Sequence, residues 1–265
     1  MQPEHLQAPI GVFDAGIGSY GIARRIRQHY PTQDILYFAD RASFPYGTKT
    51  KAELAACVGH AIARLADMGA AAVVLASNAP TVMVLDEIRA AQPVPVLGIH
   101  PPVAQALKAS RTGRVAVLGV ASLVHSEEIR AHVECEADGR PIELVDASVL
   151  VQWVEEGTFL SDAPRTLQAV QSFLRELQRR LPGLDVCTLS STHLPWLTPF
   201  FEQAAPEIAF LDPAASLMPR LQPHVSAGSG RTVCIATASA AMPLSGLQRM
   251  LDRLGVPLRP RLVAA

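Results

Sequence analysis

The chain has 265 residues, of which 49% are hydrophobic and 18% are charged. This composition excludes a disordered chain and is typical of a globular protein with one large domain or two of modest size. The formal net charge is −1 and no long basic run occurs, so nothing electrostatic points to nucleic acid or to an acidic membrane surface.

No apolar stretch is long enough to span a bilayer, and the N-terminal segment MQPEHLQAP lacks the basic and apolar regions of a secretory signal. The four cysteines have no CxxC spacing, which argues against a zinc site or a redox pair. Free thiols in a reducing compartment are the favoured interpretation. We therefore expect a cytoplasmic protein without a metal site.

Short apolar runs alternate with longer amphipathic segments along the chain. Nearly continuous apolar runs are typical of strands that are buried on both faces. They predict strands at 10–13, 35–39, 72–76, 94–99, 115–120, 142–147, 185–190, 208–211 and 232–238. Apolar residues at helical spacing predict helices over 51–68, 162–180 and 243–254. The alternation predicts an α/β fold with mostly parallel sheets.

Two stretches of the chain share one plan. Both VVLASNAPT (73–81) and LSSTHLPWL (189–197) read as strand, serine, polar residue, nearby proline and then helix. This repetition favours two similar doubly wound domains, which we place at 1–99 plus 209–265 and at 100–208. If the carboxyl ends of the two sheets face each other, they form an interdomain cleft suited to a small molecule.

The first predicted strand runs into DAGIGSYG, which begins at Asp14. Gly16, Gly18 and Gly21 match GxGxxG, and Asp40 ends the next strand, as in a dinucleotide fingerprint. Asp14 argues against this interpretation, because its carboxylate would lie near a pyrophosphate. The glycines could instead allow close strand–helix packing around a small anion.

Several other polar residues allow a functional and a purely structural interpretation. Asp14 could bind an ammonium group or assist proton transfer, or it could cap a helix. The loop SFPYGTK (43–49) could hold a carboxylate on backbone N–H groups, or it could be an ordinary tight turn. His193 could be a general acid or base, or a helix cap. Ser77 and Ser191 could be N-caps, and neither lies in the G-x-S-x-G pattern of a serine hydrolase.

Together these motifs resemble glutamate racemase, of the aspartate/glutamate racemase superfamily. That family carries a D-S-G-x-G-G turn, a V-P-Y-G-T-K loop, and strands ending in C-N-T-A and G-C-T-H-Y-P. The corresponding segments here read DAGIGS, FPYGTK, SNAP and SSTHLP, in the same order. The likeness continues in VPVLGIHPP, TGRVAVLG and WVEEG and covers nearly the whole chain.

The resemblance implies two α/β domains and cofactor-independent interconversion of L- and D-glutamate, which supplies D-glutamate for peptidoglycan. In the family, a cysteine from each domain exchanges a proton on opposite faces of the substrate Cα. The resemblance assigns assisting roles to Asp14 and His193, and makes Glu155 the carboxylate partner of His193. The substrate-binding positions implied in the same way are Ala15, Pro45, Tyr46, Gly47, Asn78, Ala79 and Thr192. The expected partners are a small carboxylate such as glutamate and a second copy of the chain.

The departures from the family pattern fall at the residues that carry out and support the family's reaction. Both cysteine positions are serine here, Ser77 and Ser191, and Ala15, Ala79 and Leu194 replace residues with polar groups. Because an alkoxide needs a far larger pKa shift than a thiolate, we predict that racemase activity is weak or lost. The alternatives are a non-catalytic binder of glutamate or another small carboxylate, an enzyme with a changed reaction that uses Asp14 and His193, and a dinucleotide-dependent enzyme.

Overall fold

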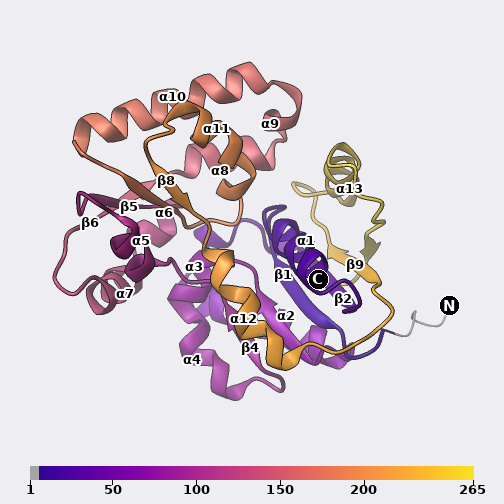
Figure 1. Ribbon diagram of the computed structural model, residues 1–265. Helices are drawn as coiled ribbons and strands as arrows, with labels where there is room; N and C mark the ends of the chain where they lie inside the picture. The colour runs from indigo at the N-terminus through magenta and orange to yellow at the C-terminus, as the bar shows by residue number, and fades with distance from the viewer. Residues whose placement is uncertain (1–5) are drawn as a thin grey trace. The chain divides into compact units, whose positions relative to one another are not determined.

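The computed structural model describes residues 6–265, which divide into two α/β units (Figure 1). Unit 1 contains the residues up to Ile99 together with Ala214–Ala265, and unit 2 is His100–Pro213. The second crossing, placed at 208/209 on the sequence alone, falls after Pro213 in this division because the strand Ala209–Leu211 pairs within unit 2.

Unit 1 contains a six-stranded sheet in the order β10-β9-β2-β1-β3-β4, and all neighbouring strands are parallel. The central strands β1, β2 and β3 are buried along their whole length, as their apolar runs predict. The bounds are β1 Ile10–Asp14, β2 Ile35–Asp40, β3 Ala72–Leu75, β4 Val96–Gly98, β9 Thr232–Thr237 and β10 Arg261–Leu262.

Helices cover both faces of this sheet. Along β2, Tyr37 bonds to Ser19 of α1, whereas Leu36 and Phe38 join the apolar cluster that α2 forms with the sheet. Because successive side chains of a strand point to opposite faces, α1 and α2 lie on opposite sides. The helices are α1 Ser19–His29, α2 Lys51–Asp67, α3 Asn78–Pro80, α4 Asp86–Ile88, α12 Leu217–Leu221 and α13 Leu244–Arg253, and a π-helical turn spans Thr81–Leu85.

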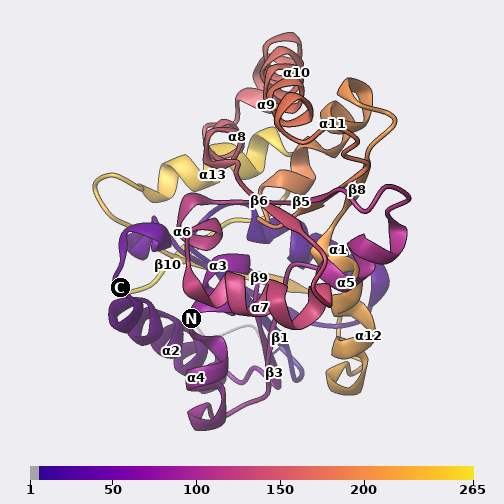
Figure 2. The same cartoon turned by 90° about the vertical axis from the view of Figure 1, so that its left-hand side faces the viewer.

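Unit 2 contains a four-stranded parallel sheet in the order β6-β5-β7-β8. Within this unit the sheet lies between α10 and α11 on one side and α5 and α7 on the other (Figures 1 and 2). The strands are β5 Val115–Gly119, β6 Ile142–Asp146, β7 Val186–Leu189 and β8 Ala209–Leu211. The helices are α5 Val103–Ala109, α6 Ala121–Val124, α7 Glu127–Ala137, α8 Ser148–Glu155, α9 Thr158–Ser161, α10 Ala163–Arg180 and α11 Thr198–Ala204.

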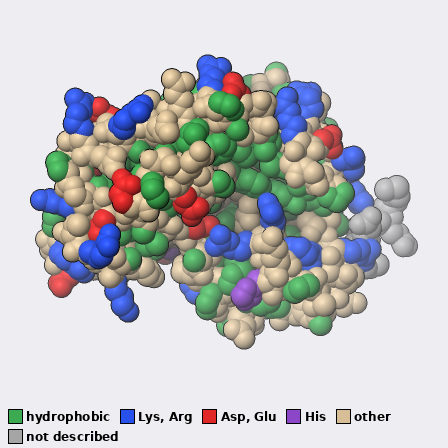
Figure 3. All heavy atoms as spheres, turned by 45° about the horizontal axis from the view of Figure 1, so that its top comes forward, with side chains coloured by type: hydrophobic (Ala, Val, Ile, Leu, Met, Phe, Trp, Pro, Cys, Tyr) green, Lys and Arg blue, Asp and Glu red, His purple; other side chains and the backbone are tan. Residues whose placement is uncertain are grey.

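The predicted α/β fold with parallel sheets is confirmed, and each of the nine predicted apolar runs contains a strand. On the face shown in Figure 3, basic and acidic side chains occur together with hydrophobic ones, in keeping with a net charge of −1. Across residues 6–265, none of the helices combines the length and the apolar character needed to cross a membrane.

Candidate functional site

The first group of site residues lies at the carboxyl edge of the unit 1 sheet. Phe13 of β1 pairs with Leu75 of β3, so Ala15 and Ser77, each two residues further on, are level with each other. Asp14 is the last residue of β1 and is 4% exposed. The parallel register therefore places Asp14, at the end of β1, and Ser77, after β3, at the same edge of the sheet, and we call this edge of unit 1 the unit 1 half-site.

Helix capping does not explain the two most prominent residues of the unit 1 half-site. The N-cap of α1 is Gly18 and not Asp14. Ser77 precedes α3, but its side chain makes no capping hydrogen bond. The capping interpretation of Asp14 and Ser77 is therefore wrong.

Asn78 carries a buried acceptor that has no hydrogen-bond donor among the residues that the structure describes. Its Nδ2 donates to the carbonyl oxygen of Ile99 at 2.9 Å, which fixes the orientation of the amide. Its Oδ1 is buried and has no hydrogen-bond partner among residues 6–265. An unsatisfied buried acceptor costs about 1–3 kcal/mol. A ligand with an N–H or O–H donor would offset this cost.

The segment after Asn78 is held by close packing against β4. Thr81 Oγ1 accepts a hydrogen bond from the backbone N–H of Ile99 at 3.1 Å. A Cβ at Gly98 would lie 2.4 Å from Thr81 Cγ2 and 2.6 Å from Leu85 Cδ2. The π-helical turn Thr81–Leu85 therefore sits directly on a glycine, and this contact fixes the position of Asn78.

The predicted carboxylate-binding loop has its tyrosine turned inward. Tyr46 is 7% exposed, and its hydroxyl donates to Asp40 Oδ2 at 3.0 Å. Burial, reinforced by the charge of Asp40, raises the pKa of Tyr46 well above its usual value. The 3₁₀ turn Tyr46–Thr48 uses the N–H groups of Thr48 and Lys49 and not those of Tyr46 and Gly47. The backbone N–H groups of Tyr46 and Gly47 therefore remain for a ligand, whereas Pro45 has no N–H and offers none.

Asp40 has a structural task that does not fit the dinucleotide interpretation. One carboxylate oxygen accepts from Tyr46 and the other from the hydroxyl of Thr237 at 2.9 Å. Both oxygens thus tie loops of unit 1 to the end of β2. A ribose-binding carboxylate would have to accept from the ligand instead.

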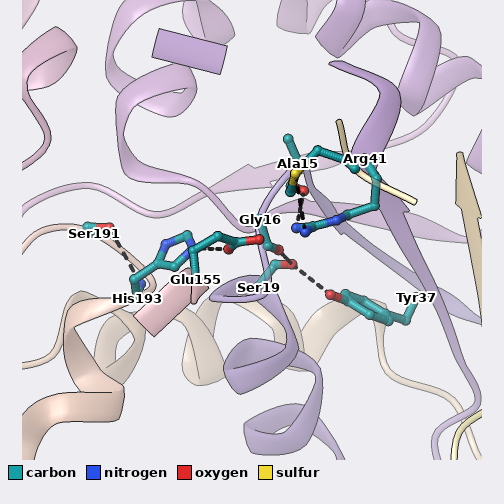
Figure 4. Close-up of polar contacts among 9 residues, drawn as sticks. Ala15, Gly16, Ser19, Tyr37, Arg41, Glu155, Ser191 and His193 are labelled. Carbon is teal, nitrogen blue, oxygen red and sulfur yellow. Dashed lines mark hydrogen bonds and ion pairs between the residues drawn. The ribbon is translucent and has the colours of Figure 1, made fainter. Parts of the chain in front are cut away.

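The glycine turn after β1 is braced from inside the unit. Ser19 Oγ donates to the carbonyl oxygen of Gly16 at 3.0 Å and lies 3.0 Å from the hydroxyl of Tyr37 (Figure 4). Because a serine hydroxyl has one proton, Tyr37 is the donor in the second bond. Burial raises the pKa of Tyr37, so this donor stays protonated.

Arg41 belongs to the unit 1 half-site, although the sequence patterns did not indicate it. The residue is 6% exposed, and its Nη1 donates to the carbonyl oxygen of Ala15 at 3.1 Å (Figure 4). Its guanidinium also lies over the ring of Phe44, at 5.4 Å from the centroid. An arginine in a predicted loop is normally solvated, and the one available signal was its place directly after a strand.

The second group of site residues lies after β7 in unit 2. His193 Nε2 is 2.9 Å from Glu155 Oε2, and their side chains are 7% and 13% exposed (Figure 4). The backbone N–H of His193 donates to Ser191 Oγ at 3.4 Å. Ser191 and Thr192 are both 6% exposed. We call Glu155, Ser191, Thr192 and His193 the unit 2 half-site.

The helix-cap alternative for His193 is wrong, because its side chain makes no capping hydrogen bond to the turn Leu194–Leu197. The ring is held by the carboxylate of Glu155 instead. With Nε2 engaged by a carboxylate, Nδ1 is the ring nitrogen that remains for proton exchange. The carboxylate partner predicted for His193 is thus in contact with it.

No buried cysteine supplies a thiolate in place of the two serines. Burial raises the pKa of Cys187 on β7 to about 12. Burial likewise raises the pKa of Cys234 on β9 to about 12. At neutral pH both groups are thiols, and a thiol is neither a base nor a good nucleophile.

Each α/β unit has a parallel sheet with polar residues at its carboxyl edge, and unit 2 holds a buried histidine–carboxylate pair. These are the features that the resemblance to the amino-acid racemase class predicts. The sequence profile of the Asp/Glu/Hydantoin racemase family matches residues 20–221. The chain belongs to this family. Within it, the chain is a member of the glutamate racemase group, as similar proteins of that name show.

The glutamate racemase of Ectopseudomonas mendocina is 32% identical over 218 residues, which cover 82% of this chain and 81% of that protein. The glutamate racemase of Roseiflexus sp. is 31% identical over 260 residues, which cover 94% of this chain and 93% of that protein. The crystal structure of glutamate racemase from Thermus thermophilus, in complex with beta-chloro-D-alanine, is 27% identical. It matches with a TM-score of 0.80 over 97% of each chain.

Proposed function

We propose that this protein is a glutamate-racemase-like protein that binds glutamate or a similar small carboxylate, and that its racemase activity is weak or lost. The observation that carries the binding proposal is the buried Oδ1 of Asn78, which lacks a donor among residues 6–265. The ammonium group of an amino acid is a donor suited to this acceptor. Asp14 lies at the same edge of the sheet and adds a carboxylate, whose negative charge attracts an ammonium group.

The proposal for catalysis follows from Ser77 and Ser191. Inversion at Cα requires a base on one face and an acid on the other, and we place the ligand Cα next to Ser77. A serine hydroxyl donates and accepts hydrogen bonds at neutral pH but does not ionise in the range that a thiol reaches. Cys187 and Cys234 remain protonated. We therefore propose that the protein still binds the ligand but no longer removes the Cα proton by the family mechanism.

The test separates binding from turnover. Calorimetry with L- and D-glutamate measures binding, and circular dichroism follows interconversion of the two enantiomers. We expect binding with a turnover far below the usual enzyme range of about 1–1,000 per second. A turnover within that range contradicts the loss of racemase activity, and the absence of binding contradicts the proposal as a whole.

The intact pair of His193 and Glu155 favours a second candidate, a reaction that uses His193 as a single base. A single base can remove the Cα proton and return one to the same face, which exchanges hydrogen without inversion. Proton NMR of L- and D-glutamate in D₂O would show loss of the Cα signal of one enantiomer. We expect His193→Asn to abolish this exchange, and exchange that persists in this variant contradicts the assignment to His193.

A further inference from the structure

The unit 2 half-site holds a serine, a histidine and a carboxylate in one chain of contacts (Figure 4). Glu155 Oε2 lies 2.9 Å from His193 Nε2, and Ser191 Oγ accepts the backbone N–H of His193 at 3.4 Å. In the view of Figure 4 the imidazole ring lies between the other two side chains. A hydroxyl, a base and a carboxylate that orients the base are the groups that activate a serine nucleophile.

The contact with Glu155 decides which ring nitrogen of His193 is the base. An ionised carboxylate only accepts hydrogen bonds, so Nε2 carries the proton of the neutral ring. The free lone pair is then on Nδ1, which has no hydrogen-bond partner among residues 6–265. Within the described chain, Ser191 Oγ bonds only to the backbone N–H of this same histidine. Nucleophile and base thus lie on one short turn, and the bond between such groups often tightens only when substrate binds.

Backbone donors suited to an oxyanion lie beside the hydroxyl. Neither the N–H of Ser191 nor that of Thr192 makes a hydrogen bond to any part of the chain that the structure describes, although both residues are 6% exposed. Buried N–H groups are rarely left unpaired in folded proteins. The N–H of a nucleophilic serine, and that of the residue after it, are donors that stabilise the oxyanion in acyl transfer.

We infer that unit 2 carries a second activity, the hydrolysis of an ester of a small acyl group through an acyl-serine at Ser191. His193 is the general base, and Glu155 is the positioning residue that orients His193. This activity goes beyond the proposed function and does not depend on it, because every group involved belongs to the unit 2 half-site. A serine hydroxyl suits this reaction, since its proton passes to the base in the transition state and no prior ionisation is needed.

The reaction balances with water as the only co-reactant. Ser191 Oγ attacks the acyl carbon while its proton passes to Nδ1 of His193, and the N–H groups of Ser191 and Thr192 stabilise the oxyanion. The bond from the acyl carbon to the leaving oxygen then breaks, and that oxygen takes the proton from Nδ1. Water repeats these steps on the acyl-serine, which restores the hydroxyl and the base. The net change converts ester and water into carboxylic acid and alcohol.

The experiment uses p-nitrophenyl acetate, whose hydrolysis by the full chain releases a coloured phenolate. Ser191→Ala and His193→Asn are compared with Ser172→Ala and His125→Asn, which replace exposed residues of the same unit. The second pair controls for slow hydrolysis by any exposed hydroxyl or imidazole. We expect the site variants to lose roughly 100-fold or more in kcat/KM, the usual contribution of a general base, and the controls to keep the rate. Mass spectrometry of the quenched reaction should find the acetyl group on Ser191.

Glu155→Gln tests the positioning role, because glutamine keeps an acceptor for Nε2 but removes the charge. We expect kcat to fall by roughly 10-fold or more while KM changes little, since the charge that stabilises the imidazolium formed in the reaction is lost. Glu156→Gln, at the exposed neighbouring position, is the control. A Glu155→Gln variant that loses stability but keeps kcat overturns the role of Glu155.

Hydrolysis that Ser191→Ala leaves intact, or an acetyl group found only on other side chains, overturns the second activity. If His193→Asn does not fold, Ser191→Ala and the site of acetylation in the unmodified protein still decide. A protein that binds glutamate but is not acetylated at Ser191 overturns the second activity alone. A protein that is acetylated at Ser191 but does not bind glutamate overturns the proposed function alone.

Discussion

The imidazole of His193 is held by Glu155, with 2.9 Å between Nε2 and Oε2, although 38 residues separate the two in the chain. Glu155 ends α8 and His193 follows β7, so the pair joins a helix end to a strand end within unit 2. Both side chains are largely withdrawn from water. Removing Glu155 would leave the buried Nε2 of His193 without this hydrogen bond, and such a loss is costly away from water.

The first prediction concerns the stability that this contact provides. Glu155→Ala should lower the free energy of unfolding by about 1–3 kcal/mol, because it leaves the buried Nε2 of His193 without its partner. Glu156→Ala is the matched control, since Glu156 is the next residue in the chain but is exposed, and it should change stability by less than about 0.5 kcal/mol. Urea denaturation of both variants measures the difference. Equal effects would show that the contact adds nothing beyond a surface interaction.

The second prediction concerns the two serines. Replacing both by cysteine, Ser77→Cys with Ser191→Cys, should raise the rate of D/L-glutamate interconversion by roughly 100-fold or more, the usual contribution of general acid–base groups. Each single variant should stay near the basal rate, because inversion needs a group on each face. The double variant Ser77→Ala with Ser191→Ala controls for side-chain size. A double-cysteine variant as slow as this control would show that the rest of the site no longer supports racemisation.

The third prediction concerns acid stability and Asp185, which is 8% exposed just before β7. Burial acts to raise its pKa, but hydrogen bonds from Ser110, Arg111 and Thr112 outweigh burial and lower the pKa below the usual 3.8. At a pH between the pKa of Asp185 in the folded protein and its pKa in the unfolded chain, the unfolded chain binds more protons. The stabilisation from Asp185 is therefore complete above about pH 4 and is lost as the pH falls further.

Asp185→Asn should therefore lower the urea midpoint at pH 7 and flatten the loss of stability below pH 4. Asp138→Asn is the control, because Asp138 is exposed at the end of α7 and its left-handed backbone suits asparagine. Urea titrations at pH 7 and at pH 3 provide the comparison. If stability falls as steeply below pH 4 in Asp185→Asn as in the unmodified protein, other carboxylates cause the pH dependence.

The fourth prediction concerns the glycine under the π-helical turn. Gly98→Ala places a Cβ against Thr81 and Leu85 and should cost about 1–3 kcal/mol, as overpacking usually does. It should also weaken glutamate binding, because the displaced turn carries Asn78. Gly59→Ala, inside α2 with open space around it, should instead stabilise the protein by roughly 0.5–1 kcal/mol. Thermal unfolding and calorimetry together test both effects, and a Gly98→Ala variant with normal stability would rule out the close packing.

The sequence predicted the strands well because most of them are buried runs in the middle of parallel sheets. It missed β10, since Arg261–Leu262 is short and exposed at the sheet edge and has no apolar run around it. It also missed the π-helical turn, because TVMVL reads as an ordinary helix and does not show that Thr81 and Leu85 pack on Gly98.

The site was predictable where a motif places residues side by side, and less so where folding brings distant residues together. SSTHLP marked Ser191, Thr192 and His193, and the contact of His193 with Glu155 was predicted only through the family resemblance. Arg41 lies next to Ala15 because β1 and β2 are adjacent in the sheet. The local sequence ADRASF does not indicate this neighbour. The inward turn of Tyr46 likewise depends on Asp40, a partner that the loop motif does not specify.

The order of strands in unit 1 has a consequence for how the chain is made. Strand β2 pairs on one side with β1 and on the other with β9, which begins almost 200 residues later at Thr232. A chain that emerges from the ribosome therefore exposes the edge of β2 throughout the synthesis of unit 2. Unit 2 is contiguous in sequence and can complete its own sheet first. We expect the half of the protein that is synthesised first to finish folding last, with an open strand edge available to other nascent chains in the interval.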